Sequence, residues 1–376
     1  MNRKKRKTAL ILLLAILCAI VLLGIRGTRK TIDKTVPARV YEDNGTTYAP
    51  SSITISGTLK KTWSSTSFVG TFAMESYEPS CRDGAEAKIN WADNEHPILT
   101  FFYAGNFSQL DVKSIDIDKD MDRMMVTLND GNRIPAVGFG VFRIPADGPT
   151  YEAVRHALQA GYRHIDTAAA YFNEADVGRA VADSGIPREK IFVTSKLWLQ
   201  DYGYEAANKG IDTSLSKLGM DYIDLYLLHQ PYGDVAGAWK ALEDAKAAGK
   251  IKSIGVSNMT PRIWNTFVPQ FDTLPAVNQV ETHVFHQQQA AHQYMKKYGV
   301  QHESWGPFAE GRNDFFTNPV LTEIGQKYNK SAAQTALRFL LQSDVVVIPK
   351  STHKERMEQN LDVFDFTLTE QEMQAI

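Results

Sequence analysis

Four side chains that suit carbonyl chemistry stand at or just after the ends of three predicted strands. In the stretch GYRHIDTAAAYFNEADVG, an apolar strand ends on Asp166, and the small-residue turn after it carries Tyr171. The next predicted strand ends on Lys196, in VTSKLW, and the one after it ends on His229, in IDLYLLHQP. An acid followed by a tyrosine is a weak signal alone, but three successive strands that end on such groups indicate a built site.

These residue types fit the reduction of a carbonyl group by hydride transfer, which leaves an alkoxide that needs a proton. A tyrosine can supply that proton, although its ordinary pKa of about 10 makes it a slow acid near neutrality. We expect the ammonium of Lys196 to lower the pKa of Tyr171, with Asp166 holding the lysine charged and oriented. His229 would donate a hydrogen bond to the substrate oxygen, where negative charge develops. This chemistry needs no metal, and we predict no metal site.

Each of these residues also has a plain structural interpretation. Lys196 would then be a solvated strand end, His229 a core histidine and Tyr171 a loop aromatic. However, the later predicted strands also end on polar or aromatic residues, which are Ser257, Asn258, Gln279, Trp305 and Lys350. The carboxyl ends of the strands of a parallel barrel share one rim, and a hydrophobic core has no use for so many polar groups there. The joint pattern favours a functional rim.

The elements that would position these residues alternate from residue 123 to the C-terminus, which is the pattern of an α/β protein with a (β/α)8 TIM barrel. A hairpin with an Asp-Gly turn comes first, formed by Met125–Thr127 and Arg133–Pro135. The candidate strands are Ala136–Phe139, Arg163–Asp166, Ile191–Lys196, Tyr222–His229, Ile251–Ser257, Ala276–Glu281, Val300–Trp305 and Val345–Lys350. Amphipathic segments between them include Thr150–Ala160, Asn173–Ser184, Gly203–Leu218, Val235–Ala248 and Gln287–Tyr298. Asn173 is expected to cap the second of these helices.

A candidate phosphate site follows the last predicted strand. Lys350 and Ser351 stand at the end of that strand, and Arg356 stands at the start of a predicted helix. Two cations and a hydroxyl suit a 2′-phosphate, and a helix N-terminus adds partial positive charge. No GxGxxG motif follows a predicted strand, so a Rossmann domain is not indicated.

From Met125 to Ile376 the chain resembles the aldo-keto reductase family. The stretches that carry the resemblance are, in chain order, GFGVF, GYRHIDTAAAYFNEADVG, TSKLW, LLHQP, IGVSN, NQVE, SWGPF and IPKSTHKERMEQN. The resemblance implies an NADPH site on the functional rim and a catalytic tetrad of Asp166, Tyr171, Lys196 and His229. It also implies that Trp305, otherwise a core aromatic, stacks on the nicotinamide. The remaining cofactor-binding residues that it implies are Ser257, Asn258 and Gln279 at the carboxamide, with Lys350, Ser351, Arg356 and Asn360 at the other end.

Three positions depart from the family pattern. Val284 stands where the family usually has proline after His283, and Gly306 stands where serine is common after Trp305. Gln359 stands where a glutamate near the adenine is frequent. These changes touch loop shape or adenine contacts and leave the chemistry intact. The chain ends at Ile376, whereas family members continue into a segment that closes part of the substrate pocket. The identity of the carbonyl substrate therefore stays open.

We predict an enzyme, an NADP-dependent oxidoreductase that reduces aldehydes or ketones to alcohols with Tyr171 as general acid. One alternative is a cofactor-binding regulatory barrel with little or no turnover, because the resembled family includes channel-associated subunits. Another is a class I aldolase in which Lys196 forms a Schiff base, which an ion pair with Asp166 would disfavour. Oxidation of NADPH by small aldehydes separates the first two hypotheses, and borohydride trapping with a keto substrate tests the third.

The first 26 residues predict a signal anchor that forms a single transmembrane helix. Five basic residues, Arg3 to Lys7, precede the uninterrupted apolar run Ala9–Ile25, and no good small-residue cleavage site follows. A cleaved signal peptide is the main alternative. Residues 27–50 are polar and predict a linker, and residues 51–122 hold short alternating segments that predict a small antiparallel β domain. We assign that domain no chemistry, and an interaction or spacer role is the default.

The side of the membrane is not fixed by the charges. The five basic residues before the apolar run are followed by four after it, Arg26, Arg29, Lys30 and Lys34. The positive-inside rule therefore leans only slightly towards a cytoplasmic N-terminus, which would export the rest of the chain. A reductase that needs NADPH suits the cytoplasm, and we expect the barrel there. An exported, idle barrel and a fusion of two unrelated genes near Met124 are the other hypotheses.

Composition narrows the partners. The formal net charge of −2 gives no reason to expect nucleic acid. The two cysteines, Cys18 in the apolar run and Cys81, are not expected to pair, and two cysteines cannot build a metal cluster. The expected partners are a small aldehyde or ketone and, through the N-terminal helix, the membrane. We expect the barrel to be monomeric.

Overall fold

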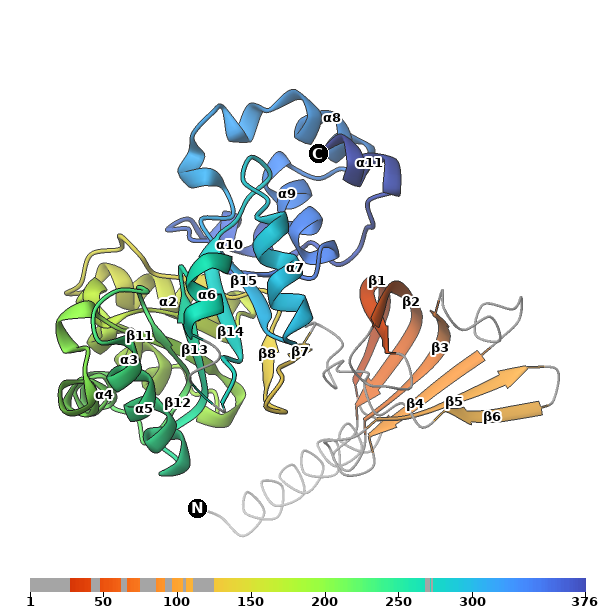
Figure 1. Ribbon diagram of the computed structural model, residues 1–376. Helices are drawn as coiled ribbons and strands as arrows, with labels where there is room; N and C mark the ends of the chain where they lie inside the picture. The colour runs from red at the N-terminus through yellow and green to blue at the C-terminus, as the bar shows by residue number, and fades with distance from the viewer. Residues whose placement is uncertain are drawn as a thin grey trace, which may run out of the picture. The chain divides into compact units, whose positions relative to one another are not determined.

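The computed structural model describes residues 28–41, 48–61, 66–74, 86–91, 97–103, 106–110, 125–267, 271 and 273–376. The chain divides into two compact units, Met1–Asp122 and Arg123–Ile376 (Figure 1). The predicted anchor, residues 1–26, lies outside the described residues. No helix in the described part is both long and apolar enough to cross a bilayer.

The first unit contains an antiparallel sheet whose six strands pair in chain order. These strands are β1 (Thr28–Tyr41), β2 (Tyr48–Lys61), β3 (Thr66–Met74), β4 (Glu86–Trp91), β5 (Pro97–Tyr103) and β6 (Asn106–Leu110). Four apolar side chains of the first three strands are almost completely buried, namely Ile32, Ile55, Leu59 and Phe68. Their exposed neighbours along the strands show that this sheet buries one face, as antiparallel sheets commonly do.

The linker predicted over residues 27–50 is wrong for most of its length. Strand β1 covers residues 28–41 and pairs with β2 along its whole length, from Thr28 opposite Lys61 to Tyr41 opposite Tyr48. The polar composition of this stretch concealed the strand, in which Ile32 is buried between exposed neighbours among the residues whose burial is described. In a strand only alternate side chains need to be apolar, so a segment rich in charge can still pair.

The second unit is built on eight parallel strands that neighbour each other in chain order. These are β9 (Phe139–Gly140), β10 (His164–Asp166), β11 (Phe192–Leu197), β12 (Ile223–Leu228), β13 (Ile251–Ser257), β14 (Val277–Glu281), β15 (Gln301–Trp305) and β16 (Val346–Val347). The sheet closes on itself where Val137 forms a parallel bridge with Val347. The backbone N–H of Gly138 donates to the carbonyl oxygen of Val347 at 2.8 Å. The predicted (β/α)8 barrel is therefore confirmed.

The helices of this unit follow the strands along the chain. They are α2 (Pro149–Ala160), α3 (Glu174–Asp183), α4 (Tyr204–Leu218), α5 (Val235–Ala247), α6 (Pro261–Phe267), α7 (Gln289–Lys297), α8 (Pro319–Lys327), α9 (Ala332–Gln342), α10 (Lys354–Leu361) and α11 (Glu370–Ala375). The five helices predicted by range agree with α2, α3, α4, α5 and α7 to within two residues at each end. Helix α4 shows why the pattern was readable, because it buries Ala207, Ile211, Ser214 and Leu218, which recur on one helical face.

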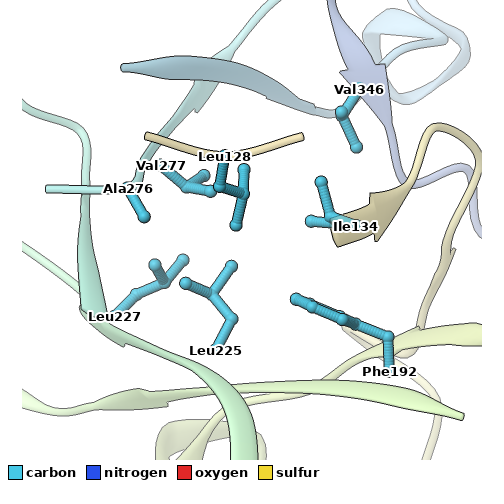
Figure 2. Close-up of a cluster of buried hydrophobic side chains, with 8 residues drawn as sticks. All are labelled: Leu128, Ile134, Phe192, Leu225, Leu227, Ala276, Val277 and Val346. Atoms are coloured by element: carbon cyan, nitrogen blue, oxygen red, sulfur yellow. The ribbon is translucent and has the colours of Figure 1, made fainter. Parts of the chain in front are cut away.

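A short hairpin closes the end of the barrel at which the strands begin. It consists of β7 (Met125–Thr127) and β8 (Arg133–Pro135), as predicted. Its side chains complete a buried apolar cluster of Leu128, Ile134, Phe192, Leu225, Leu227, Ala276, Val277 and Val346 (Figure 2). The side-chain amide of Asn129 donates to the carbonyl oxygen of Pro275, just before β14, at 2.9 Å. Burial of each large aliphatic side chain in such a cluster contributes about 1.5–3 kcal/mol.

Candidate active site

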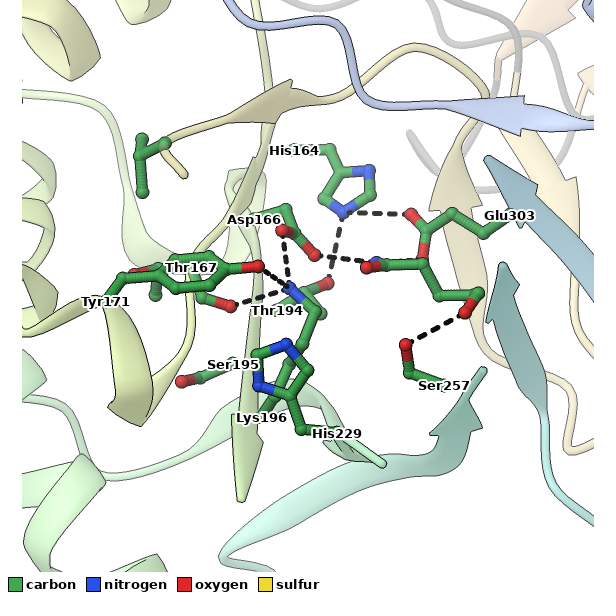
Figure 3. A network of polar contacts seen from close by, with 12 residues as sticks. His164, Asp166, Thr167, Tyr171, Thr194, Ser195, Lys196, His229, Ser257 and Glu303 are labelled. Atoms are coloured by element: carbon green, nitrogen blue, oxygen red, sulfur yellow. Dashed lines mark hydrogen bonds and ion pairs between the residues drawn. The ribbon is translucent and has the colours of Figure 1, made fainter. Parts of the chain in front are cut away.

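The ends of β10 and β11 bring three of the predicted catalytic residues into contact. The ammonium of Lys196 lies 2.6 Å from Oδ1 of Asp166, 2.9 Å from the carbonyl oxygen of Thr167 and 3.5 Å from the hydroxyl of Tyr171 (Figure 3). Lys196 is fully buried, and Asp166 is 2% exposed. Tyr171 comes from the short 3-10 helix η2 (Ala169–Tyr171), which follows β10. A phenol, an ammonium and a carboxylate thus form one connected chain.

The loop that presents Tyr171 is held in place by Asn173. This residue occupies the N-cap position of α3, as predicted, but its side chain accepts no hydrogen bond from that helix. Its Oδ1 instead accepts from the hydroxyl of Thr167 at 2.8 Å, and its Nδ2 donates to the carbonyl oxygens of Val141 and Ile144, each at 3.1 Å. The side chain does not bond the helix because the buried carbonyl oxygens of the loop need hydrogen-bond donors, and the amide of Asn173 supplies them. Asn173 therefore joins the loops that follow β9 and β10.

His229 follows β12 and faces the same site. Its ring centroid lies 5.6 Å from that of Tyr171 and 5.0 Å from that of Trp198. On the other side of Tyr171, the ring of Phe142 lies 4.9 Å away between centroids. The structure therefore brings all four residues of the predicted tetrad together, and aromatic rings flank the two that would meet a substrate.

The electrostatics of the site differ in one respect from the expectation. Burial is the largest single effect on the pKa of Lys196 and lowers it, but Asp166, Tyr171 and Glu303 together outweigh burial, so the pKa of this lysine is raised. Burial also raises the pKa of Tyr171, and the nearby ammonium of Lys196 offsets this only in part. The predicted net lowering of the tyrosine pKa is thus wrong for this structure, because desolvation of the phenolate is the larger effect. Tyr171 is consequently protonated at neutral pH and has a proton to give.

His229 is a neutral imidazole in this site. Burial, followed by the charge of Lys196, lowers the pKa of His229 to about 3. A neutral imidazole carries one N–H, so it can donate one hydrogen bond. Its Nδ1 has no hydrogen-bond partner within the described part of the chain. The neutral ring can therefore donate one hydrogen bond to a substrate oxygen.

Next to His229 lie three residues predicted to bind the nicotinamide. The indole N–H of Trp305 donates to Oδ1 of Asn258 at 2.9 Å, and Nδ2 of Asn258 donates to the carbonyl oxygen of His229 at 3.1 Å. The hydroxyl of Ser257 donates to the backbone carbonyl oxygen of Gln279 at 2.8 Å. These bonds fix the Trp305 ring and the Asn258 amide beside His229 of the tetrad.

Gln279 is placed differently from the other predicted cofactor ligands. Its Nε2 donates to Oδ2 of Asp166 at 2.8 Å and to Oε2 of Glu303 at 2.9 Å. Both hydrogens of that amide are thereby committed inside the barrel, which leaves its carbonyl oxygen for other contacts. Sequence reasoning missed Glu303 altogether. The available signal was a charged residue in the middle of the buried strand β15, two positions before Trp305 and so on the same side of the strand.

The predicted phosphate site is polar and open. Lys350 and Arg356 are exposed, and no hydrogen bond or ion pair engages either of them among the described residues. Ser351 is largely buried, and its hydroxyl donates to the carbonyl oxygen of His353, just before α10. Asn360 is 4% exposed and hydrogen-bonds the hydroxyl of Tyr162, which places it at the inner side of α10. Two uncommitted cations beside a helix start are a donor set that fits the phosphate of NADPH.

Comparison with known proteins decides the family. The sequence profile of the Aldo/keto reductase family matches residues 137–376. The chain belongs to the aldo/keto reductase family. This reductase is 46% identical over 254 residues to an aldo-keto reductase of Mycolicibacterium smegmatis, a match that covers 67% of the chain and 91% of that relative. It is 42% identical over 252 residues to glyoxal reductase of Bacillus subtilis, again covering 67% of the chain and 91% of the relative.

Solved structures agree with these relatives. The barrel matches the crystal structure of an aldo-keto reductase from Bombyx mori in complex with NADP, with a TM-score of 0.63 and 36% identity. That match covers 67% of the present chain and 91% of the other. The reductase is an NADP-dependent oxidoreductase that reduces aldehydes or ketones, and NADPH is its cofactor. Because the relatives are oxidoreductases, the alternative of a regulatory barrel is not favoured.

Proposed function

We propose that Tyr171 is the general acid of this reduction and that Lys196, Asp166 and His229 set its surroundings. The observation that carries the proposal is the contact chain from Tyr171 through Lys196 to Asp166, with 3.5 Å and 2.6 Å between the polar atoms. His229 completes the group at the same rim. A protonated phenol next to a fixed ammonium is a proton donor whose conjugate base is stabilised as soon as it forms.

When NADPH is bound, the carbonyl carbon would receive a hydride from it. As the carbonyl double bond opens, negative charge collects on the substrate oxygen, and the neutral imidazole of His229 donates a hydrogen bond to it. The hydroxyl of Tyr171 then gives its proton to that oxygen, which yields the alcohol. Lys196 stabilises the resulting phenolate, and Asp166 keeps the lysine charged. The phenolate is afterwards reprotonated from solvent.

The cofactor assignments follow from where the predicted ligands lie. We assign Ser257, Asn258 and the carbonyl oxygen of Gln279 to the carboxamide, and Trp305 to the nicotinamide face. Lys350, Ser351 and Arg356 are assigned to the 2′-phosphate. Asn360 is assigned to the adenine end, with its contact to Tyr162 as the feature that orients it. The exposure of Lys350 and Arg356 supports this assignment, because both charges remain available to a ligand.

The substrate class we propose is aromatic or apolar aldehydes. Phe142 is 48% exposed although its ring packs on Tyr171, and Trp198 packs on His229 from the other side. Apolar rings next to the reacting groups lose contact with water when an apolar substrate docks on them, and this favours binding. A small polar aldehyde gains little from the same surface.

The test is an absorbance assay of NADPH oxidation with benzaldehyde and acetaldehyde, using the full chain. We expect turnover with both, and kcat/KM higher for benzaldehyde. Equal kcat/KM values for the two aldehydes would overturn only the proposed substrate class. Tight NADPH binding without turnover of any aldehyde in the panel would overturn the enzymatic proposal and restore the regulatory barrel.

For location, we propose a single-pass anchor at residues 1–26 that holds a monomeric barrel on the cytoplasmic side of a membrane. The apolar run after five basic residues supports the anchor, and the need for NADPH supports the side. Protease added to spheroplasts, whose plasma membrane is intact, should leave the barrel uncut. Digestion of the barrel under those conditions would favour export instead.

A further inference from the structure

Glu303 is a buried acid that the reaction described above does not use. It lies in the middle of β15, is fully buried, and points from that strand towards Asp166 across the barrel interior (Figure 3). Strand β15 is not a neighbour of β10, so this approach exists only because the sheet is closed. A carboxyl group in such a place needs a physical reason, because burial of a charge without a partner is costly.

One amide joins Glu303 to the catalytic residues. Nε2 of Gln279 donates to Oε2 of Glu303 at 2.9 Å and to Oδ2 of Asp166 at 2.8 Å. The other oxygen of Asp166 accepts from Lys196 at 2.6 Å. A primary amide has two N–H groups, and both are used here to hold the two acids. Loss of Glu303 would therefore leave one N–H of Gln279 without its acceptor, and the amide would be held by Asp166 alone.

The charges of this group do not balance if both acids are ionised. The titratable side chains around Glu303 are Asp166 and His164 of β10, Lys196 of β11 and Tyr171 of η2. Burial lowers the pKa of His164 to about 3, so this ring is neutral. Among the described residues around Glu303, Lys196 is then the one cation available to two carboxyl groups, and it contacts Asp166.

The second oxygen of Glu303 shows which acid carries a proton. Oε1 of Glu303 has no hydrogen-bond partner among the described residues, and it lies 3.7 Å from Nε2 of His164. An ionised oxygen in that position would be desolvated and uncompensated. Burial, followed by the charge of Asp166, accordingly raises the pKa of Glu303 to about 8. The acid is neutral at pH 7 and ionises at moderately alkaline pH.

We infer that Glu303 is a positioning residue for proton transfer from Tyr171, an inference that rests on the proposed role of Tyr171. The neutral acid holds Gln279 and Asp166 in place, and the ionised acid adds negative charge beneath the ion pair of Asp166 and Lys196. That added charge raises the pKa of Tyr171 and the pKa of Lys196. Reduction needs a protonated Tyr171, so ionisation of Glu303 keeps the enzyme active to higher pH.

The test compares pH profiles of kcat/KM between about pH 6 and 12 for the wild type and Glu303→Gln, because the pKa of Tyr171 is raised above its ordinary value of about 10. Glutamine keeps the acceptor for Gln279 but cannot ionise. We expect the alkaline limb of kcat/KM in Glu303→Gln to fall about one pH unit earlier than the wild-type limb, whatever its activity at pH 7, which is the size of effect that one nearby charge has. Glu303→Asp keeps the carboxyl and should move the limb back towards the wild type.

A matched control is Glu174→Gln, which makes the same chemical change at another buried acid. Glu174 is 1% exposed, and its Oε1 accepts from the hydroxyl of Ser195 at 2.6 Å, outside the chain from Gln279 to Lys196. Its variant should leave the alkaline limb unmoved. An alkaline limb of Glu303→Gln that superimposes on the wild-type limb would overturn the inference, and so would an equal shift in the control.

A second measurement needs neither turnover nor a folded variant. Infrared difference spectra of the wild type between about pH 6.5 and 9.5 should show the loss of one protonated-carboxyl band with a midpoint near pH 8. Absence of such a band would overturn the inference. A wild type that shows the band but reduces no aldehyde would overturn the proposed function and leave the protonation state of Glu303 established.

Discussion

The two ends of the barrel interior differ in polarity. At the end where the strands begin, Ile134 of the hairpin meets Phe192 and Val346 in a cluster without polar side chains. From the middle of the strands towards the end where they finish, the interior holds Glu303, Gln279, Asp166 and Lys196. Strand β11 shows the change along its length, from Phe192 in the apolar cluster at its start to Lys196 near its end.

This difference separates stability from chemistry. The apolar end contributes to the free energy of folding through burial, at about 1.5–3 kcal/mol for each large side chain. The buried ion pair of Lys196 and Asp166 contributes little net stability, because desolvation offsets much of the attraction. The comparison therefore predicts that changes at the polar end reduce turnover, whereas changes at the apolar end reduce the free energy of unfolding.

The largest expected effect is that of Tyr171→Phe at the polar end. Loss of the phenolic proton should lower kcat for aldehyde reduction by about 10²–10⁴-fold, while the dissociation constant for NADPH changes little. Stopped-flow or steady-state assays with benzaldehyde measure the first quantity, and fluorescence titration measures the second. Tyr204→Phe is the control, because it removes a hydroxyl that bonds Asp244 on the outside of the barrel. Wild-type turnover in Tyr171→Phe would remove this residue from the mechanism.

At the apolar end, Ile134→Ala should have the next largest effect. The side chain is fully buried, and its truncation should lower the free energy of unfolding by about 2–5 kcal/mol. Ile134→Val should cost about 0.5–1.5 kcal/mol, which provides a graded control. Urea unfolding measures both values, and kcat of the folded fraction should stay near that of the wild type. A loss of kcat without a loss of stability would show that the two ends are coupled.

Much of this division was readable from the sequence. The order of strand ends on Asp166, Lys196 and His229 was enough to gather the tetrad, because the carboxyl ends of parallel strands share a rim. The hairpin was readable from its Asp-Gly turn. Both inferences rest on local patterns with a fixed geometric consequence, and the structure confirms them.

What escaped prediction depends on contacts between distant parts of the chain. Glu303 meets Gln279 and Asp166 only inside the closed barrel, and no local pattern reports which polar strand residues face each other there. The direction of the Tyr171 pKa depends on how far the loops desolvate the phenol, which strand order does not reveal. Asn173 stands at the predicted N-cap position, but burial in the loop gives its side-chain amide other partners than the helix.

The smallest expected effect lies outside both ends, at the exposed cations beyond β16. Replacing Lys350 and Arg356 together by Ala should raise the KM for NADPH about 10–100-fold and leave the KM for NADH nearly unchanged, because only NADPH carries a 2′-phosphate. The effect is limited because both side chains are exposed, and solvent screens their charges. Raising the salt concentration should therefore narrow the difference between the two cofactors in the wild type but not in the double variant. Lys217→Ala, an exposed cation on α4, should alter neither KM. Equal increases in KM for NADH and NADPH would show that these residues hold another part of the cofactor, and the 2′-phosphate assignment would have to be abandoned.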